Sequence, residues 1–192
     1  MITSDQTWRN TKLQEWVGYY EDIIPKDECK NLIRDVKNSG LLKPSTYSNH
    51  TGEIKRSDNR VVMDDMWVKD KTTSSIINDF FGKVIRKYSD KFERFSCQRH
   101  SGFRVNRYSS GGFMSEHTDN IHHSHGQQYG FPQVSALLFL NDNYKGGEFI
   151  VAGNEYETKI GSGIIFPSNF MFPHEVKKIT HGERWSIVTW LM

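Results

Sequence analysis

The chain has 192 residues, 25 Lys and Arg against 23 Asp and Glu, and a formal net charge of +2, which is too small to argue for nucleic acid or a membrane as partner. Its length fits one domain that buries roughly 70% of the surface exposed by the unfolded chain, so disulfides are not needed for folding. The start of the chain lacks a signal-peptide pattern, no run approaches the roughly 18 apolar residues of a membrane span, and Cys29 and Cys97 have no redox or metal-ligand spacing, so we expect a soluble, cytoplasmic protein with reduced structural cysteines.

The first half of the chain predicts a strand, two helices and a polar segment between them. The opening run WVGYYEDI is typical of a strand. Apolar residues at helical spacing predict one helix over 25–37 and a second over 72–91. The intervening residues 43–60 are polar and rich in turn formers, so they indicate an exposed loop or an irregular hairpin.

From about residue 94 onward the pattern changes to short strands separated by glycine-containing turns, which is typical of a sandwich or jelly roll. The predicted strands cover 94–98, 102–108, 113–119, 134–140, 147–152, 156–160, 163–166, 174–179 and 184–191. No linker or internal repeat is visible. We therefore expect a single α+β domain over 1–192, in which the strand, helices and loop of 1–93 support a jelly-roll core formed by 94–192.

The run His117-Thr-Asp119 is a candidate metal site, although a His-x-Asp match by itself occurs by chance. On an extended segment the two side chains point the same way, so both can bind one metal. His174 begins a distant strand that a jelly roll can place beside the first. Two imidazoles and one carboxylate are the facial triad of non-haem Fe(II) oxygenases, in which open positions bind a 2-oxo acid and dioxygen.

Arg184 and Ser186 alternate on the last predicted strand, so their side chains share one face. A guanidinium presents a planar fork to a carboxylate, and the serine hydroxyl can add a hydrogen bond. If Arg184 is buried without a partner, the cost is high, and a bound dicarboxylate would remove it. The pair therefore predicts a carboxylate-binding clamp.

Four segments together resemble the 2-oxoglutarate and Fe(II)-dependent dioxygenases, in their prolyl 4-hydroxylase-like branch. They are NRYSSGGFMSEHTDN, LLFLNDNYKGGEFIV, GSGIIFPSNFMFPHEV and THGERWSIVTWL, which cover roughly residues 100–191. The opening segment YYEDIIPKDECKNLI is similar to the family's N-terminal strand and helix. Many prolyl 4-hydroxylases have lysine where this chain has Arg184, a change that keeps the charge.

The resemblance implies a double-stranded β-helix with iron on His117, Asp119 and His174. Arg184 would bind the far carboxylate of 2-oxoglutarate, and the phenol of Tyr108 would border this cosubstrate. Arg104 and Asn106 alternate with Tyr108 and rank below it as site residues.

The resemblance also implies an oxygenase that uses Fe(II), 2-oxoglutarate and dioxygen, with ascorbate as an optional stimulant. We predict hydroxylation of a protein or peptide side chain, with proline as the first candidate. The alternatives are a hydroxylase of a free amino acid or small metabolite, an oxidiser of nucleic-acid bases, and a non-catalytic jelly-roll binding module. The triad together with Arg184 argues against the last, because a binding module has no need of open metal positions and a clamp.

Two polar loops are candidates for choosing the substrate. The loop over 121–133 contains His122, His123 and His125, which could form a second metal site but lack a carboxylate or cysteine partner, so a solvated loop is favoured. The loop over 45–60 is the other candidate rim. Long loops beside a site often act as lids.

Overall fold

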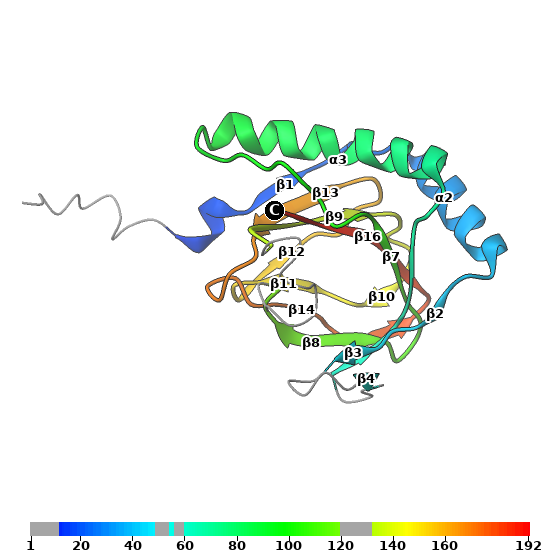
Figure 1. Cartoon of the computed structure of the whole chain (residues 1–192). Helices are drawn as coiled ribbons and strands as arrows, with labels where there is room; N and C mark the ends of the chain where they lie inside the picture. Colours follow the sequence, from blue (N-terminus) through cyan, green and yellow to red (C-terminus); the bar gives the residue numbers. More distant parts are fainter. Residues whose placement is uncertain (1–11, 49–53, 56–59, 120–131) are drawn as a thin grey trace, which may run out of the picture.

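The computed structural model describes residues 12–48, 54–55, 60–119 and 132–192. Two antiparallel sheets face each other, and two helices lie along one side (Figure 1). The elements are η1 (Leu13–Trp16), β1 (Gly18–Tyr20), α2 (Lys26–Ser39), β2 (Lys43–Pro44), β3 (Tyr47–Ser48), β4 (Ile54–Lys55), β5 (Val61–Val62), β6 (Asp64–Trp67), α3 (Lys71–Lys91), β7 (Arg104–Tyr108), β8 (Phe113–His117), β9 (Val134–Phe139), β10 (Lys145–Gly146), β11 (Phe149–Val151), β12 (Asn154–Tyr156), β13 (Gly163–Pro167), β14 (His174–Val176), β15 (Ile179–His181) and β16 (Arg184–Leu191).

The larger sheet has the order β1-β13-β9-β16-β7-β6-β2, and the smaller has the order β12-β11-β14-β8-β5. One apolar cluster fills the space between the outer face of the larger sheet and helices α2 and α3. A second cluster, with Tyr108, Phe139 and Phe149 among its members, lies between the sheets. The chain therefore has the α+β jelly-roll architecture that its strand pattern predicts.

Both predicted helices are confirmed to within two residues, and their ends have clear local causes. Helix α2 follows Pro25 and ends at Gly40, whose φ of 64° is the left-handed conformation that glycine adopts without steric cost. Helix α3 begins after Asp70, whose carboxylate accepts a hydrogen bond from the backbone N–H of Thr73 at 2.7 Å. The apolar side of each helix packs against the outer face of the larger sheet and supports it.

Several strand predictions are wrong in position. No strand forms over 94–98, where the backbone instead bonds to the end of the chain through the N–H groups of Gln98 and Arg99. A tight turn at Ala152 and Gly153 pairs Val151 with Asn154, so the strand predicted at 156–160 runs over 154–156.

The predicted strand 174–179 is two strands, because β14 pairs with β8 and β11 whereas β15 pairs with β10. Strands β5, β6 and β10 were not predicted, because they are short and polar residues flank or occupy them. For 43–60 the sequence left an exposed loop and an irregular hairpin open, and the pairing of β3 with β4 favours the hairpin; residues 49–53 and 56–59 lie outside the described part.

No helix in the described part of the chain has the length and apolar composition needed to cross a membrane.

A charged cluster joins α2 to the start of β16, next to Arg184. The Glu183 carboxylate lies 2.7 Å from the Lys37 ammonium and 3.6 Å from the Arg107 guanidinium, and it accepts a hydrogen bond from the Trp185 indole at 3.2 Å. Partial burial raises the Glu183 pKa, but the bonds from Lys37 and Trp185 outweigh it, so the pKa lies below its ordinary value of 4.5. The cluster therefore stabilises the folded state while Glu183 is ionised.

We expect Glu183→Gln to lower the free energy of unfolding by about 0.5–1 kcal/mol at pH 7. Because the folded pKa is depressed, the stabilisation is complete above the unfolded pKa and disappears as the pH falls through the folded one. Urea unfolding of both proteins between pH 7 and pH 3 should show the difference shrinking below about pH 4.5. A difference that stays constant over this range would show that the Glu183 charge has no role.

Candidate active site

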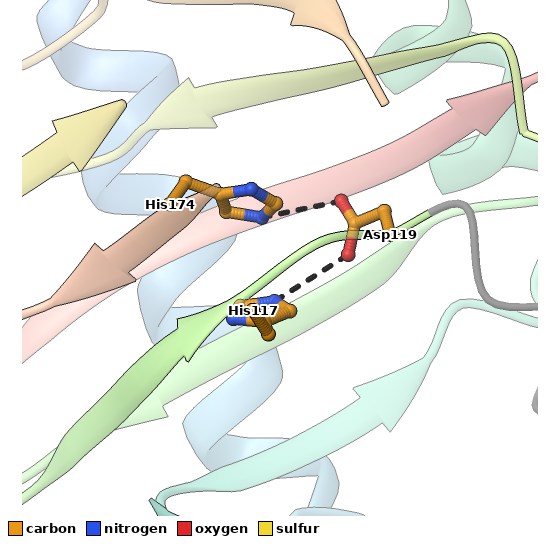
Figure 2. Close-up of side chains that lie close together, drawn as sticks. All are labelled: His117, Asp119 and His174. Atoms are coloured by element: carbon orange, nitrogen blue, oxygen red, sulfur yellow. Dashed lines mark ion pairs between the residues drawn. The ribbon is translucent and has the colours of Figure 1, made fainter. Parts of the chain in front are cut away.

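His117, Asp119 and His174 come together between the two sheets. His117 ends β8 and His174 begins β14, and these two residues are directly paired across the smaller sheet. Asp119 lies two residues beyond the end of β8, and its carboxylate points between the two imidazoles (Figure 2). His117 Nε2 is 3.4 Å from Asp119 Oδ1, and His174 Nε2 is 3.3 Å from Asp119 Oδ2. The candidate ligand atoms of all three lie within 4.8 Å of one another.

Backbone carbonyls orient both imidazoles. His117 Nδ1 lies 2.9 Å from the Ser115 carbonyl oxygen, and His174 Nδ1 lies 3.2 Å from that of Phe172. Because a carbonyl can only accept, each Nδ1 carries the hydrogen and donates it. Each Nε2 therefore points toward the carboxylate: while protonated it donates a hydrogen bond to Asp119, and once deprotonated it offers a lone pair to a metal, as is usual in histidine metal sites.

His117, Asp119 and His174, called the trio below, have electrostatics that favour an ionised Asp119 carboxylate. Burial alone would raise the Asp119 pKa, but the His174 charge and the hydrogen bonds from His117 and His174 hold it well below its usual range. Burial lowers the His117 pKa, whereas the hydrogen bond and charge of Asp119 raise it, and the net direction is upward. Without a metal, the imidazoles and the carboxylate thus stabilise one another, and a divalent cation would replace the protons.

Two fully buried serines support Asp119, Ser135 by direct contact and Ser168 through Ser135. Ser135 on β9 donates a 2.6 Å hydrogen bond to Asp119 Oδ2, and its Oγ lies 2.7 Å from Ser168 Oγ, just after β13. Neither serine was predicted as a site residue. The available signal was a polar residue inside the otherwise apolar run VSALLF, because such a residue on a buried strand needs a polar partner.

We expect Ser135→Ala to weaken divalent metal binding about 10- to 100-fold, because the carboxylate loses the hydrogen bond that fixes its orientation. Calorimetric titration with Mn(II) measures the effect without turnover. Ser162→Ala is the matched control, because Ser162 is also fully buried but donates to the Lys159 carbonyl at 2.7 Å. Equal Mn(II) affinity in Ser135→Ala and wild type would contradict the orienting role.

Arg184 is 1% exposed and has no carboxylate partner among the described residues. Its Nη1 lies 3.4 Å from Ser186 Oγ, while Nε and Nη2 have no hydrogen-bond partner there. Three aromatic rings surround the guanidinium at 5.3–5.6 Å: Tyr108, Phe139 and Phe149. Such rings only partly replace water around a cation, so the arrangement calls for an anionic ligand.

Gly147, directly after β10, packs close to the Arg184 side chain. Its φ is 74°, and a Cβ at this position would clash with Ile179 and lie 3.3 Å from Arg184 Cδ. Only glycine leaves both the backbone conformation and this space available.

The pocket around Arg184 and the trio are neighbours. The Phe149 ring centroid lies 5.6 Å from the Arg184 guanidinium carbon and 6.2 Å from the centre of the His174 ring. Arg184 and His174 are therefore both neighbours of the Phe149 ring. An anion bound to Arg184 would thus lie close to the trio.

The remaining predicted residues line the same space. Tyr108 on β7 is paired with Arg184, and Asn106 with Ser186. Burial raises the Tyr108 pKa, with the Arg184 charge opposing the shift, so its phenol stays protonated as a hydrogen-bond donor. The predictions for His122, His123 and His125, and for most of the 45–60 rim, fall outside the described residues or on side chains not described.

Two histidines and one carboxylate on the inner faces of a jelly roll are the ligand set of the non-haem Fe(II) oxygenases, a class of metal-dependent enzymes. The profile of the 2OG-Fe(II) oxygenase superfamily matches residues 103–192, which include all of these side chains. The match covers just under half of the chain, so similarity to this superfamily is shown for the segment that carries the trio and Arg184.

Known relatives are similar over part of the chain. Prolyl 3-hydroxylase 2 of Rattus norvegicus is 39% identical over 69 residues, which cover 32% of this chain and 10% of the relative. A PKHD-type hydroxylase of Shewanella oneidensis is 34% identical over 92 residues, covering 45% of this chain and 40% of the relative. The chain thus spans between a tenth and two fifths of the length of these relatives.

Solved structures are similar over nearly the whole chain. A prolyl 4-hydroxylase of Pseudomonas putida has a TM-score of 0.68 at 18% identity, covering 92% of this chain and 91% of that one. A prolyl hydroxylase of Trichoplax adhaerens, in complex with a hypoxia inducible factor peptide fragment, has a TM-score of 0.71 at 16% identity, covering 93% and 84%. At such identities the likeness shows the shared fold.

Proposed function

We propose that this protein is an Fe(II)- and 2-oxoglutarate-dependent oxygenase that hydroxylates a protein or peptide side chain, with proline as the first candidate. The observation that carries the proposal is the pairing of two features between the sheets. One is a two-histidine, one-carboxylate trio with its Nε2 atoms directed inward. The other is a buried arginine without an anionic partner in the described part of the chain, which like His174 is a neighbour of the Phe149 ring.

The donor set fits Fe(II). Neutral imidazole nitrogens and an ionised carboxylate are ligands that this ion accepts, and three protein ligands leave positions open. His117, Asp119 and His174 would hold the iron, which when bound supplies the dioxygen activation that, coupled to 2-oxoglutarate oxidation, hydroxylates a C–H bond. Ser135 would keep the carboxylate in its ligating orientation, as its 2.6 Å hydrogen bond supports.

The other residues would bind the cosubstrate and exclude water. Arg184 would donate to the far carboxylate of 2-oxoglutarate, with Ser186 beside it and the protonated Tyr108 phenol as a further donor. Phe149 and Phe166 pack against His174, with ring centroids at 6.2 and 4.9 Å, and keep its surroundings apolar. A dry pocket strengthens the ionic contact to the cosubstrate.

The choice of a peptide substrate draws on the relatives. Among them are prolyl 3-hydroxylases and PKHD-type hydroxylases, and one structural neighbour was solved with a peptide fragment bound. These properties belong to those proteins. They support proline in a peptide as the first substrate to test here.

The test is succinate formation from 2-oxoglutarate by purified protein with Fe(II), ascorbate and dioxygen. Ascorbate is included because we propose that it keeps the iron reduced. Mass spectrometry of a panel of peptides and free amino acids should detect the gain of one oxygen on a proline-containing peptide. Absence of succinate under every condition would contradict the oxygenase, whereas oxygen gain confined to free amino acids or oligonucleotides would contradict the peptide substrate.

A further inference from the structure

Every second residue of β7 has its side chain on the inner face of the larger sheet, toward the trio. These residues are Arg104, Asn106 and Tyr108. Their partners on β16 are Val188, Ser186 and Arg184, in that order. Tyr108 lines the pocket of Arg184. Asn106 and Arg104 continue the row away from that pocket, and nothing in the proposed cosubstrate site uses them.

Asn106 is 4% exposed, and its Oδ1 has no hydrogen-bond partner among the described residues. It is paired with Asp65 on β6, whose carboxylate can only accept when ionised, and with Ser186 on β16. A buried amide oxygen without a donor is costly to a folded protein, so such groups in native structures are commonly completed by a ligand or by water. Asn106 therefore presents an unused acceptor.

Arg104 presents the complementary donor. Its guanidinium carbon lies 4.8 Å from the centre of the Trp190 ring, and its half-buried side chain has a buried Nε with no acceptor in the described part of the structure. None of the ion pairs found among the described residues involves Arg104. Its charge acts on both Tyr108 and His117, where it opposes the net rise in the pKa of each.

A donor and an acceptor two residues apart on one strand face match the C=O and N–H groups of an extended main chain. The Trp190 ring already stabilises the Arg104 cation, so a neutral carbonyl suffices as its acceptor. A ligand carboxylate would instead be repelled by the Asn106 oxygen and by Asp65. The row thus favours a peptide over a second acidic ligand.

We propose that Arg104 and Asn106 form a substrate subsite that holds the peptide main chain beside the residue to be hydroxylated. Arg104 donates to a substrate carbonyl, and the Asn106 oxygen accepts from a substrate N–H. The inference rests on the proposed function, and it adds which side chains select a peptide for the site.

The experiment uses full-length protein with Fe(II) and a library of acetylated, amidated heptapeptides with proline at the centre. We expect Arg104→Gln and Asn106→Leu each to raise the peptide KM about tenfold or more, with Arg104→Lys recovering part of the loss. The dissociation constant for 2-oxoglutarate, measured with Mn(II), should stay within about twofold. Arg107→Gln is the matched control, because Arg107 lies on the same strand but faces the other way, paired with Asp64 at 2.6 Å.

Three results would overturn the subsite. The first is an unchanged peptide KM in both variants. The second is an equal loss in Arg107→Gln, which would indicate a general effect on the sheet. The third is hydroxylation of free L-proline that depends on Arg104, with no peptide hydroxylated, which would leave the oxygenase standing. Failure of the proposed function looks different, because wild-type protein would then form no succinate at all.

Discussion

Arg184→Met is expected to raise the dissociation constant for 2-oxoglutarate by about thirtyfold or more while stabilising the ligand-free protein. Loss of one partner of a buried charge pair costs roughly 2–5 kcal/mol, which sets the size of the first effect. The second follows because the 1% exposed guanidinium has no anionic partner in the described structure. Replacing it by an apolar side chain of similar length removes a buried charge, worth about 1 kcal/mol or more.

Thermal unfolding with and without 2-oxoglutarate measures both effects in one experiment. Wild-type protein with Mn(II) should show a Tm that rises with 2-oxoglutarate concentration, and Arg184→Met should show a higher starting Tm without that rise. Arg107→Met is the control, because Arg107 is ion-paired with Asp64 on the opposite face of the sheet. It should lower the Tm and preserve the response to 2-oxoglutarate. A full response in Arg184→Met would place the carboxylate clamp elsewhere.

Asp119→Ala is expected to abolish both metal binding and succinate formation. The carboxylate is the only anionic member of the trio, and it contacts both imidazoles, at 3.4 and 3.3 Å. Without it, only two neutral nitrogens remain, and the site loses both its charge and one of its three ligands for Fe(II). Titration with Co(II), followed by its visible absorption, reports binding independently of turnover.

Glu116→Ala provides the control for this change. Glu116 lies on the same strand as His117, but its side chain is exposed and points away from the trio. This variant should bind Co(II) like wild type. If Asp119→Ala retained wild-type Co(II) affinity and turnover, the ligand assignment would be wrong.

The site was predictable from sequence to the extent that alternation along a strand decides side-chain direction. His117 and Asp119 are two residues apart, and Arg184 and Ser186 are likewise, so each pair was expected to share a face. Ser135 and Ser168 were not predictable in this way. Ser135 contacts Asp119 and Ser168 contacts Ser135, which joins the segment after β8, β9 and the segment after β13, all far apart in the sequence.

The strand errors have a related cause. Apolar periodicity identified the helices, because α2 and α3 each bury one side against a single sheet. It failed for β6, whose sequence DDMW is stabilised by pairing with β7 and by the ion pair of Asp64 with Arg107. It also failed over 94–98, where no strand partner is available. Neither the apolar periodicity nor the strand pairing tests the prediction of one domain over 1–192, so it stays a prediction.

The sequence by itself determined the kinds of groups present, namely two histidines and a carboxylate for a metal and an arginine for a carboxylate, because residue identity sets ligand chemistry. Only the tertiary structure decided that these groups meet. The pairing of His117 with His174 depends on which strands are neighbours in the smaller sheet, and the contacts of Phe149 with both His174 and Arg184 depend on how the two sheets pack. Burial is also a property of packing, and burial without a partner turns Arg184 from a surface cation into a binding group.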